Sequence, residues 1–307
     1  MGLLVPRSHG GSEAPRAVAR ATFETLAGAC GSTFFAWVQH HAPVRLLASS
    51  PNRALADRVL PGLAAGELQG AVAFAHLRRP GPPAVTATPV PGGGWELHGT
   101  APWLTAWGLA DVVAVAGLSP GGEVVFGLLE ARDGRGVRAS PPMALAAMEA
   151  TATVSLELDH VALDDADVIS VVPLRRWRAL DRAATSQPNP AVFGLAATCT
   201  RHLAEVDGGA AGDLEAQWRR LRERAYGLAD AGAGPEVLVG LRAEALVVTQ
   251  RCATALVAAT GGRAMARGHP AQRLAREATF YVIQAQSPAV RAATLARLLA
   301  PGEPQGA

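Results

Sequence analysis

The spacing of apolar residues changes twice along the chain and divides it into three stretches. Over residues 1–67 the spacing is helical, because apolar side chains recur at three- and four-residue intervals. The first stripe consists of Ala17, Val18, Ala21, Phe23, Leu26 and Ala29. A second apolar run covers 34–47, Pro51-Asn52 marks a turn, and a short helix is expected to end near Leu63. We therefore predict a partial N-terminal helical domain over 1–67.

The period shortens at about residue 68. Short segments rich in Val, Leu and Thr alternate with clusters of glycine and proline, and they predict strands at 70–77, 84–90, 94–99, 111–118, 123–130 and 153–158. This pattern is typical of a β-sandwich or barrel, so residues 68–175 are predicted to form a middle β-domain. Gly92-Gly93-Gly94 is predicted to be a hairpin turn, not a phosphate-binding loop, because no Lys-Ser/Thr follows it.

From about residue 186 to 300 the helical period returns. Pro190 is expected near the first turn of an Ala-rich helix that ends around Val206. Further helices are predicted at 213–229, 235–260 and 268–299, the last interrupted near Ser287-Pro288. Short Gly-rich turns between such helices predict an antiparallel bundle, and the predicted fold class is therefore α+β. The Pro/Gly-rich end 301–307 is expected to fray.

Composition and charge narrow the classes of function. The net charge of the 307 residues is only +2, too small to indicate nucleic acid as the main partner. An arginine-dense stretch, 219–224, could bind phosphate, but apolar residues recur beside it at helical spacing, which favours the solvated face of an amphipathic helix. These apolar residues are Leu214, Trp218, Leu221, Ala225 and Leu228.

The features that the sequence lacks narrow the choice of cellular compartment. No stretch approaches the roughly 20 uninterrupted apolar residues that a membrane-spanning helix needs, and no secretory signal begins the chain. Cys30, Cys199 and Cys252 lie far apart and form no C-x-x-C, so neither a disulfide framework nor a zinc site is indicated. We expect a protein of the reducing cytoplasm that binds neither membrane nor nucleic acid.

Two common catalytic signatures are missing: there is no H-E-x-x-H and no G-x-G-x-x-G after a strand. His40-His41 has no further ligand at helical spacing, so we interpret it as a surface or helix-end pair and predict no metal site. His76 lies between apolar residues and Arg78-Arg79, and it is either a strand-edge histidine or a pocket residue.

The most informative segment is the link from Gly99 to Asp111, which contains two of the six tryptophans. An indole offers a flat apolar face and a nearby hydroxyl offers a hydrogen bond, so Trp103 and Thr105 suit an isoalloxazine ring. The alternative is that Trp103 and Trp107 plug the open end of a small β-barrel. The residues alone leave both interpretations open.

An ordered set of segments resembles the acyl-CoA dehydrogenase superfamily, and the resemblance covers nearly the whole chain. Trp103-Leu-Thr105, with Gly99 before it and Ala110-Asp111 after it, is similar to the Trp-Ile/Leu-Thr flavin motif of that family. The other segments are Gly2–Gly11, Phe23–Ala27, Gly31–Phe34 with His40, Gly66-Glu67 with Gly70, Leu156–Leu163, Gly261-Gly262 and Arg276–Ala278.

The resemblance implies an FAD-binding oxidoreductase of fatty acid metabolism that acts on CH–CH groups of an acyl thioester such as acyl-CoA. It also implies a homo-oligomer, or a hetero-oligomer with a related dehydrogenase chain. Trp103 and Thr105 would lie against the flavin, and the strand residues Phe74 and Ala75 would lie beside it through their backbone. In the family a carboxylate removes the α-proton, which requires a base held close to that proton and shielded from water.

Several positions depart from the family pattern. The family's Thr/Ser-Glu-Pro after the first strand is replaced by Ala75–Arg79, and Ala258 stands where a Gln would contact the adenosine half. The position of the catalytic base falls on Ala285, which cannot accept a proton. The family's leading helices have no counterpart before Gly2, which indicates an N-terminally shortened form or a mis-called start codon.

These departures leave the catalytic residue unassigned, with Glu244 as a helix-borne candidate for the base. Three alternatives to a dehydrogenase follow. The chain could be a non-catalytic subunit of a heteromeric acyl-CoA dehydrogenase. It could be a flavin monooxygenase on the same fold, which needs no α-proton base. It could also be a binding or structural bundle that has lost flavin.

Overall fold

The structure is a computed structural model that describes residues 1–300, and its contacts divide the chain into two compact units. The first unit comprises Met1–Ala19, Ser32–Leu145 and Glu149–Ala179. The second comprises Arg20–Gly31, Ala146–Met148 and residues 180–300. The end 301–307, expected from the sequence to fray, lies outside the described residues. The division into three domains at 67 and 186 stays a prediction.

The helical prediction for 1–67 is confirmed. Two 3-10 turns, η1 (Gly2–Leu4) and η2 (Arg7–His9), precede the helices α1 (Arg16–Ala29), α2 (Gly31–Gln39), α3 (His41–Ala48) and α4 (Arg53–Ala65). Helix α4 begins where the predicted turn ends, because the Asn52 side chain accepts a hydrogen bond from the Leu55 N–H at 3.1 Å. It ends at Gly66, whose φ of +80° suits glycine.

Eight strands form one mixed sheet in the described part of the chain: β1 (Gly70–Ala73), β2 (Val85–Pro89), β3 (Trp95–Leu104), β4 (Val112–Leu118), β5 (Glu123–Glu130), β6 (Val137–Ala139), β7 (Val154–Leu163) and β8 (Val168–Pro173). Their order is β6-β7-β3-β2-β4-β5-β8, and β1 pairs with β4. The glycine triplet at 92–94 turns β2 into β3, with the Val90 N–H donating to the Gly94 carbonyl, so the predicted hairpin is confirmed.

The predicted strand boundaries need three corrections. The strand predicted at 70–77 ends at Ala73. Phe74 leaves the extended conformation, with φ −138° and ψ 14°, and the 3-10 turn η3 (Ala75–Arg78) follows. The strands predicted to end at 99 and 158 continue to Leu104 and Leu163. The short strand β6 and the strand β8 were not predicted.

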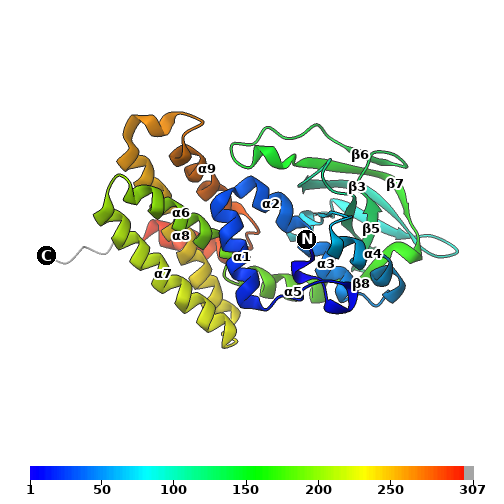
Figure 1. Cartoon of the computed structure of the whole chain (residues 1–307). Helices are drawn as coiled ribbons and strands as arrows, with labels where there is room; N and C mark the ends of the chain where they lie inside the picture. The colour runs from blue at the N-terminus through cyan, green and yellow to red at the C-terminus, as the bar shows by residue number, and fades with distance from the viewer. Residues whose placement is uncertain (301–307) are drawn as a thin grey trace. The chain divides into compact units, whose positions relative to one another are not determined.

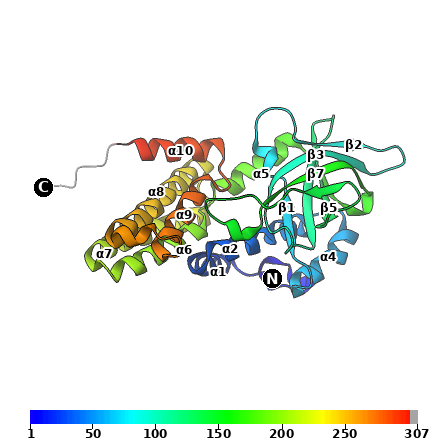
Figure 2. The same cartoon turned by 90° about the horizontal axis from the view of Figure 1, so that it is seen from above.

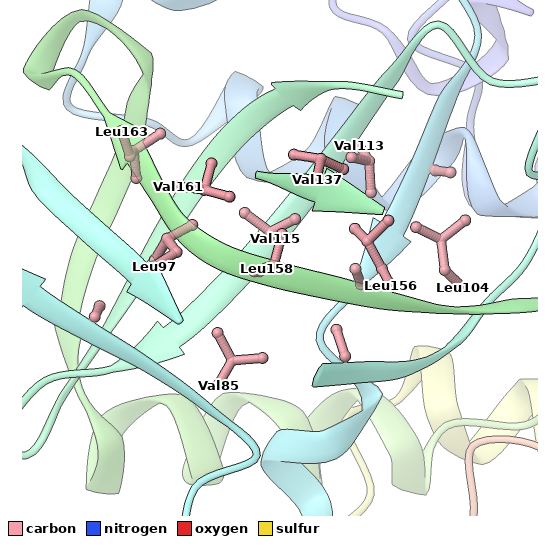
Figure 3. Close-up of a cluster of buried hydrophobic side chains, with 14 of the residues drawn as sticks. Val85, Leu97, Leu104, Val113, Val115, Val137, Leu156, Leu158, Val161 and Leu163 are labelled. Atoms are coloured by element: carbon pink, nitrogen blue, oxygen red, sulfur yellow. The ribbon is translucent and has the colours of Figure 1, made fainter. Parts of the chain in front are cut away.

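The central strands β4 and β5 of the sheet are buried on both faces. Val113 and Val115 of β4 belong to one cluster of buried side chains, drawn in Figure 3, whereas Ala114 and Ala116 belong to another. The first cluster collects apolar residues from most of the strands, which close around it. The second includes Leu60 and other residues of α3 and α4, the helices drawn close to β5 in Figure 1. Alternation along one strand therefore builds two cores.

The second unit is the predicted bundle. Its helices are α1 from Arg20 onward, the C-terminal part of α5 (Leu174–Ser186), α6 (Pro190–Ala204), α7 (Gly208–Asp230), α8 (Pro235–Thr260), α9 (Pro270–Ile283) and α10 (Pro288–Leu299), with the 3-10 turn η6 (Gly261–Met265) after α8. Figure 2 shows α6, α7, α8 and α9 running alongside one another. Four of these helices begin with proline in the first turn, which fixes their N-termini. Helix α5 was not predicted.

The arginine-dense stretch lies on α7 and is the solvated face of an amphipathic helix, as predicted. Trp218, Leu221 and Ala225 are buried on the other side of the helix. Arg219 pairs with Glu215 one turn earlier, and Arg222 pairs with Glu24 of α1. Within residues 1–300, no helix combines the length and the apolarity that crossing a membrane requires.

Candidate functional site

Trp103 stands in a β-bulge at the end of β3. Ala101 pairs with Leu156 and Leu104 pairs with Val154, so two residues of β3, Pro102 and Trp103, oppose a single residue of β7. The φ of Trp103 is +64°, a left-handed conformation that costs a residue with a side chain about 1–2 kcal/mol. The bulge leaves the indole 45% exposed. Backbone strain of this kind concentrates at ligand sites, so Trp103 is the first residue of the candidate site.

Thr105, two positions later, is buried and belongs to a row of three hydroxyls. Its Oγ1 lies 3.1 Å from Oγ1 of Thr153, which lies 3.0 Å from Oγ1 of Thr151. Each hydroxyl has one proton to donate and two lone pairs. When Thr153 donates to Thr105, the proton of Thr105 remains available for an acceptor on a ligand. This row of hydroxyls could not be predicted from the sequence, because Thr153 is far from Thr105 along the chain.

The rest of the link is fixed at both ends. The Ala106 N–H donates to the Thr151 carbonyl at 2.8 Å. At the far end the Asp111 side chain accepts from the Gln69 N–H at 2.7 Å. Trp107 packs against the buried cluster of the sheet, so the interpretation as a plug describes Trp107. It does not describe Trp103, whose indole is exposed.

Phe74 and Ala75 do not lie in a strand, which corrects the prediction of strand residues beside the flavin. Phe74 follows the end of β1, and its ring packs edge-on against Phe126 with centroids 5.6 Å apart. Ala75 begins η3, which contacts β3. Ala73 and Leu104 share the buried cluster of Figure 3. The segment of Phe74 and Ala75 thus lies next to β3, through a 3-10 turn in place of strand pairing.

Comparison with known proteins gives a fold but no sequence match. No family model matches the sequence, and no curated protein matches it either. Butyryl-CoA dehydrogenase from Megasphaera elsdenii superposes with a TM-score of 0.76 at 18% identity, over 97% of this chain and 87% of that chain. The chain has the acyl-CoA dehydrogenase fold. The predicted α+β class is therefore confirmed, and so is the resemblance at the level of the fold.

Two further structures of similar fold have other descriptions. FkbI, described as serving biosynthesis of the methoxymalonyl extender unit of the polyketide Fk520, gives a TM-score of 0.80 at 18% identity, over 98% of this chain and 89% of that chain. TdsC from Paenibacillus sp. A11-2, solved with FMN and indole, gives 0.77 at 17% identity, over 97% and 87%. The acyl-CoA dehydrogenase fold is thus found in proteins with different descriptions of their function.

In this chain of acyl-CoA dehydrogenase fold, Ala285 lies between α9 and α10 with a φ of +48°. The buried guanidinium of Arg242, on α8, donates to the carbonyls of Gln187 at 3.2 Å and Gln284 at 3.3 Å. These bonds fix the backbone next to Ala285. The methyl group of Ala285 supplies no proton acceptor, as the sequence indicated.

Two glutamates of the second unit have other contacts. Glu244, the candidate replacement base, is one-third exposed and forms an ion pair with Arg297 at 3.5 Å. Glu277 is buried, where its carboxylate accepts from Arg273 at 2.8 Å and from the Gly31 N–H at 3.3 Å. Burial raises the pKa of Glu277. Glu244 is thus less shielded than a base for an α-proton requires, and Glu277 is engaged in holding α9 to Gly31.

The histidines of the first unit are buried. His40 and His41 lie at the junction of α2 and α3, and Nδ1 of His40 accepts from the Gly70 N–H at 3.2 Å. The prediction of a surface pair was therefore wrong, although the helix-end placement was right. His76 is buried in η3, so it is not on a strand edge. Burial lowers the pKa of His40 and His76 to about 4 and that of His41 to about 3, which keeps all three neutral at pH 7.

Proposed function

We propose that this chain binds a flavin against Trp103 and acts as a flavin-dependent oxidoreductase. The observation that carries the proposal is the exposed indole of Trp103, held by a bulge in a left-handed conformation. Packing the Trp103 indole against a flat ring would give a function to a backbone conformation that otherwise only lowers stability. The residues present therefore fit the group that the fold suggests. A bound flavin supplies a two-electron acceptor.

The neighbouring residues support the same assignment. Thr105 would donate to the polar rim of the ring, in a direction set by Thr153. Phe74 and Ala75 would border the ring from the turn that follows β1. FAD is the cofactor expected from the resemblance, and the structure of TdsC with FMN gives a reason to test FMN beside it.

The reaction proposed first is oxidation at a CH–CH group of an acyl thioester, with acyl-CoA as the small-molecule substrate. This chain would need a proton acceptor at a position other than Ala285. Glu244 is the candidate that the sequence offers, and its exposure and its ion pair with Arg297 count against it. If it is the base, Glu244→Gln abolishes turnover of acyl-CoA while flavin content stays unchanged; full turnover in that variant would remove Glu244 from consideration.

A second candidate function is favoured by Ala285 itself. A flavin monooxygenase does not remove an α-proton, so it has no use for a carboxylate at this position. A third candidate is a non-catalytic subunit that assembles with a related dehydrogenase chain bearing the missing glutamate. All three candidates share the flavin site at Trp103, and they differ in the chemistry that follows.

Flavin binding is tested by reconstitution. The purified chain is incubated with FAD or FMN, desalted, and assayed for bound flavin absorbance. We expect Trp103→Ala to bind flavin about tenfold more weakly than the parent, because stacking on an indole is lost. Leu109→Ala is the matched control, since Leu109 is an exposed apolar residue of the same link. Equal flavin content in Trp103→Ala and the parent would overturn the proposal.

The reaction is tested on the reconstituted protein. Anaerobic loss of flavin absorbance on addition of acyl-CoA, by the chain alone, supports a dehydrogenase. Loss only after mixing with a related dehydrogenase chain supports the subunit. Oxygen consumption by the reduced protein that depends on an added organic substrate supports the monooxygenase.

A further inference from the structure

A second bulge lies on the same pair of strands as the bulge at Trp103. Leu97 pairs with Val161 and Gly99 pairs with Leu158, so His98 of β3 faces two residues of β7, Asp159 and His160. The φ of His160 is +51°, a left-handed conformation that is uncommon in a residue other than glycine. The bulge brings three potential metal ligands together on the exposed face of the sheet.

The ligand atoms of these three residues are close to one another. They lie within 4.8 Å of each other, and the rings of His98 and His160 have centroids 4.7 Å apart. An oxygen of Asp159 lies 3.8 Å from Nδ1 of His98 and 3.9 Å from Nε2 of His160. Ligands of a tetrahedral zinc ion are about 3.4 Å apart, so small side-chain rotations close the set around an ion.

A fourth residue orients one of the rings. Nδ1 of His160 lies 2.9 Å from a carboxylate oxygen of Glu96, on β3. With the Nδ1 proton donated to Glu96, Nε2 keeps its lone pair on the side of Asp159. Metal-bound histidines commonly donate their other ring N–H to a carboxylate in this way, which fixes the tautomer and the ring.

The backbone beneath the ligands is fixed. The Asp159 N–H donates to the Gly136 carbonyl at 2.8 Å, so the bulge is tied to the chain leading into β6. Arg138 of β6, which is next to β7, has its charge paired with Glu157. All three ligand side chains are exposed, which leaves water access to a fourth coordination position.

We propose that His98, Asp159 and His160 form a binding site for a transition-metal ion such as Zn²⁺, with Glu96 as a positioning residue for His160. Two imidazoles and one carboxylate suit zinc, copper and nickel better than the hard cations magnesium and calcium. The site goes beyond the flavin function, because no ligand residue belongs to the candidate flavin site.

The test is calorimetric titration of the tag-free, full-length chain with Zn²⁺, and with Mg²⁺ as a separate probe. We expect saturable binding of Zn²⁺ at micromolar concentration, with one ion per chain, and no binding of Mg²⁺. His98→Ala and His160→Gly should each weaken Zn²⁺ binding by at least about tenfold. His160→Gly also relieves the left-handed φ, so this variant should fold at least as stably as the parent.

His202→Ala is the matched control. His202 of α6 also pairs with a carboxylate, that of Glu205 at 3.5 Å, but this pair contains one histidine and not two. This variant should bind Zn²⁺ as the parent does. Unchanged affinity in His98→Ala and His160→Gly, or loss of binding in His202→Ala, would overturn the proposal.

Co²⁺ absorption separates positioning from ligation. Glu96→Gln should weaken Co²⁺ binding about tenfold while the spectrum at saturation keeps its shape, since the ligands are unchanged. A changed spectrum would mean that Glu96 is itself a ligand, and unchanged affinity would remove it from the site. Flavin content, measured in the same samples, should not respond to any of these substitutions.

Discussion

Trp103 and His160 are the residues through which the sheet departs from regular pairing. Each has a positive φ, each lies in a bulge between β3 and β7, and each exposes a large ring. Glycine would adopt these backbone angles at lower cost. The side chain, and not the backbone conformation, therefore explains best why a tryptophan and a histidine stand at these two positions. We propose that Trp103 binds a flavin and that His160 binds a metal ion.

The strain at Trp103 can be measured directly. Trp103→Gly and Trp103→Ala remove the same indole, but only glycine tolerates a φ of +64°. We expect the free energy of unfolding of Trp103→Gly to exceed that of Trp103→Ala by about 1 kcal/mol in urea denaturation. At Thr100, an exposed residue of β3 whose φ is not positive, the order should reverse. The same order at both positions would show that Trp103 is unstrained.

The hydroxyl row beneath Trp103 gives a second prediction. Thr153→Val removes the hydrogen-bond partner of the buried Thr105 hydroxyl, and an unsatisfied buried hydroxyl costs about 1–3 kcal/mol. We expect that loss in the free energy of unfolding, together with weaker flavin binding. Thr105→Val combined with Thr153→Val should cost less than the sum of the single changes, because the two residues share one bond. Strict additivity would mean that the two hydroxyls do not interact.

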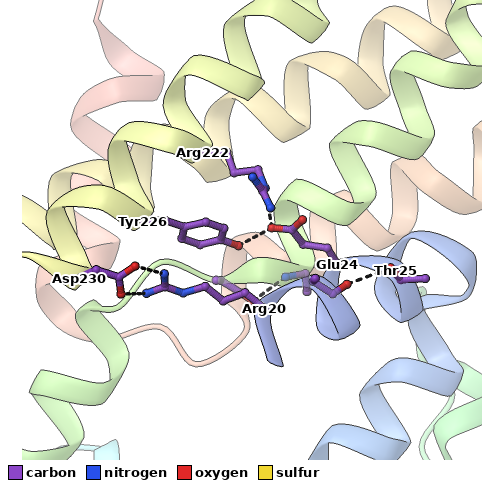
Figure 4. A network of polar contacts seen from close by, with 9 residues as sticks. Arg20, Glu24, Thr25, Arg222, Tyr226 and Asp230 are labelled. Carbon is purple, nitrogen blue, oxygen red and sulfur yellow. Dashed lines mark hydrogen bonds and ion pairs between the residues drawn. The ribbon is translucent and has the colours of Figure 1, made fainter. Parts of the chain in front are cut away.

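At the scale of elements, α1 is held to α7 in the second unit by a network around Glu24 (Figure 4). The Glu24 carboxylate accepts from the Tyr226 hydroxyl at 2.6 Å and from Arg222 at 2.8 Å. Burial and this bond raise the pKa of Tyr226. Beside it, Arg20 donates two bonds to Asp230, a more exposed carboxylate.

Removing the two acids should therefore have unequal effects. Glu24→Ala leaves the mostly buried Tyr226 hydroxyl and Arg222 without their acceptor, and we expect a loss of about 2–3 kcal/mol in the free energy of unfolding. Asp230→Ala removes an exposed ion-pair partner and should cost less than about 1 kcal/mol. Chemical denaturation of both variants checks the difference, and equal losses would contradict this account of the network.

Helices and strand centres could be predicted from sequence, because burial of one face imposes a period on local residues. The bundle from Pro190 to Leu299 and the hairpin at Gly92–Gly94 were both predicted. Strand β8 and helix α5 were missed: β8 follows closely on β7, and α5 carries few buried side chains in a strongly basic segment. The 3-10 turn after Ala73 was missed because the run of apolar residues continues through it.

The candidate sites were predictable only in part. Trp103 and Thr105 stood out through their residue types and spacing. A bulge, however, depends on the register of two strands, and neither strand alone specifies it. His98 and His160 are therefore ligands of one site only once β3 and β7 are paired. Thr153 and Glu96 were missed for the same reason, since their partners are distant along the chain.

For the whole molecule, the fold is retained at sequence identities of 17–18% with the structures compared. Cores tolerate such divergence when the apolar pattern and total volume persist. Chemistry is expected to be less tolerant, since the family resemblance would place a catalytic base where this chain has Ala285. A shared fold therefore does not fix the reaction.

Acid should destabilise the molecule through its buried histidines. The unfolded chain takes up a proton at each histidine near pH 6.5, whereas folded His40 and His76 do so only near pH 4 and His41 near pH 3. Between these values the unfolded state binds more protons, so stability falls as pH falls from about 6.5 to 4. Each histidine adds about 1.4 kcal/mol per pH unit to this slope.

His76→Phe isolates the contribution of one histidine. The substitution also changes the packing, but that change is measured at pH 7.5 and does not alter the slope of unfolding free energy against pH. We expect the slope of unfolding free energy between pH 6.5 and 4.5 to be smaller by about 1.4 kcal/mol per pH unit. The parent alone cannot provide this measure, since the raised pKa of Glu277 acts in the opposite direction: its contribution is present at low pH and is lost as pH rises. An unchanged slope would mean that folded His76 titrates as it does in the unfolded chain, and so that η3 opens to water.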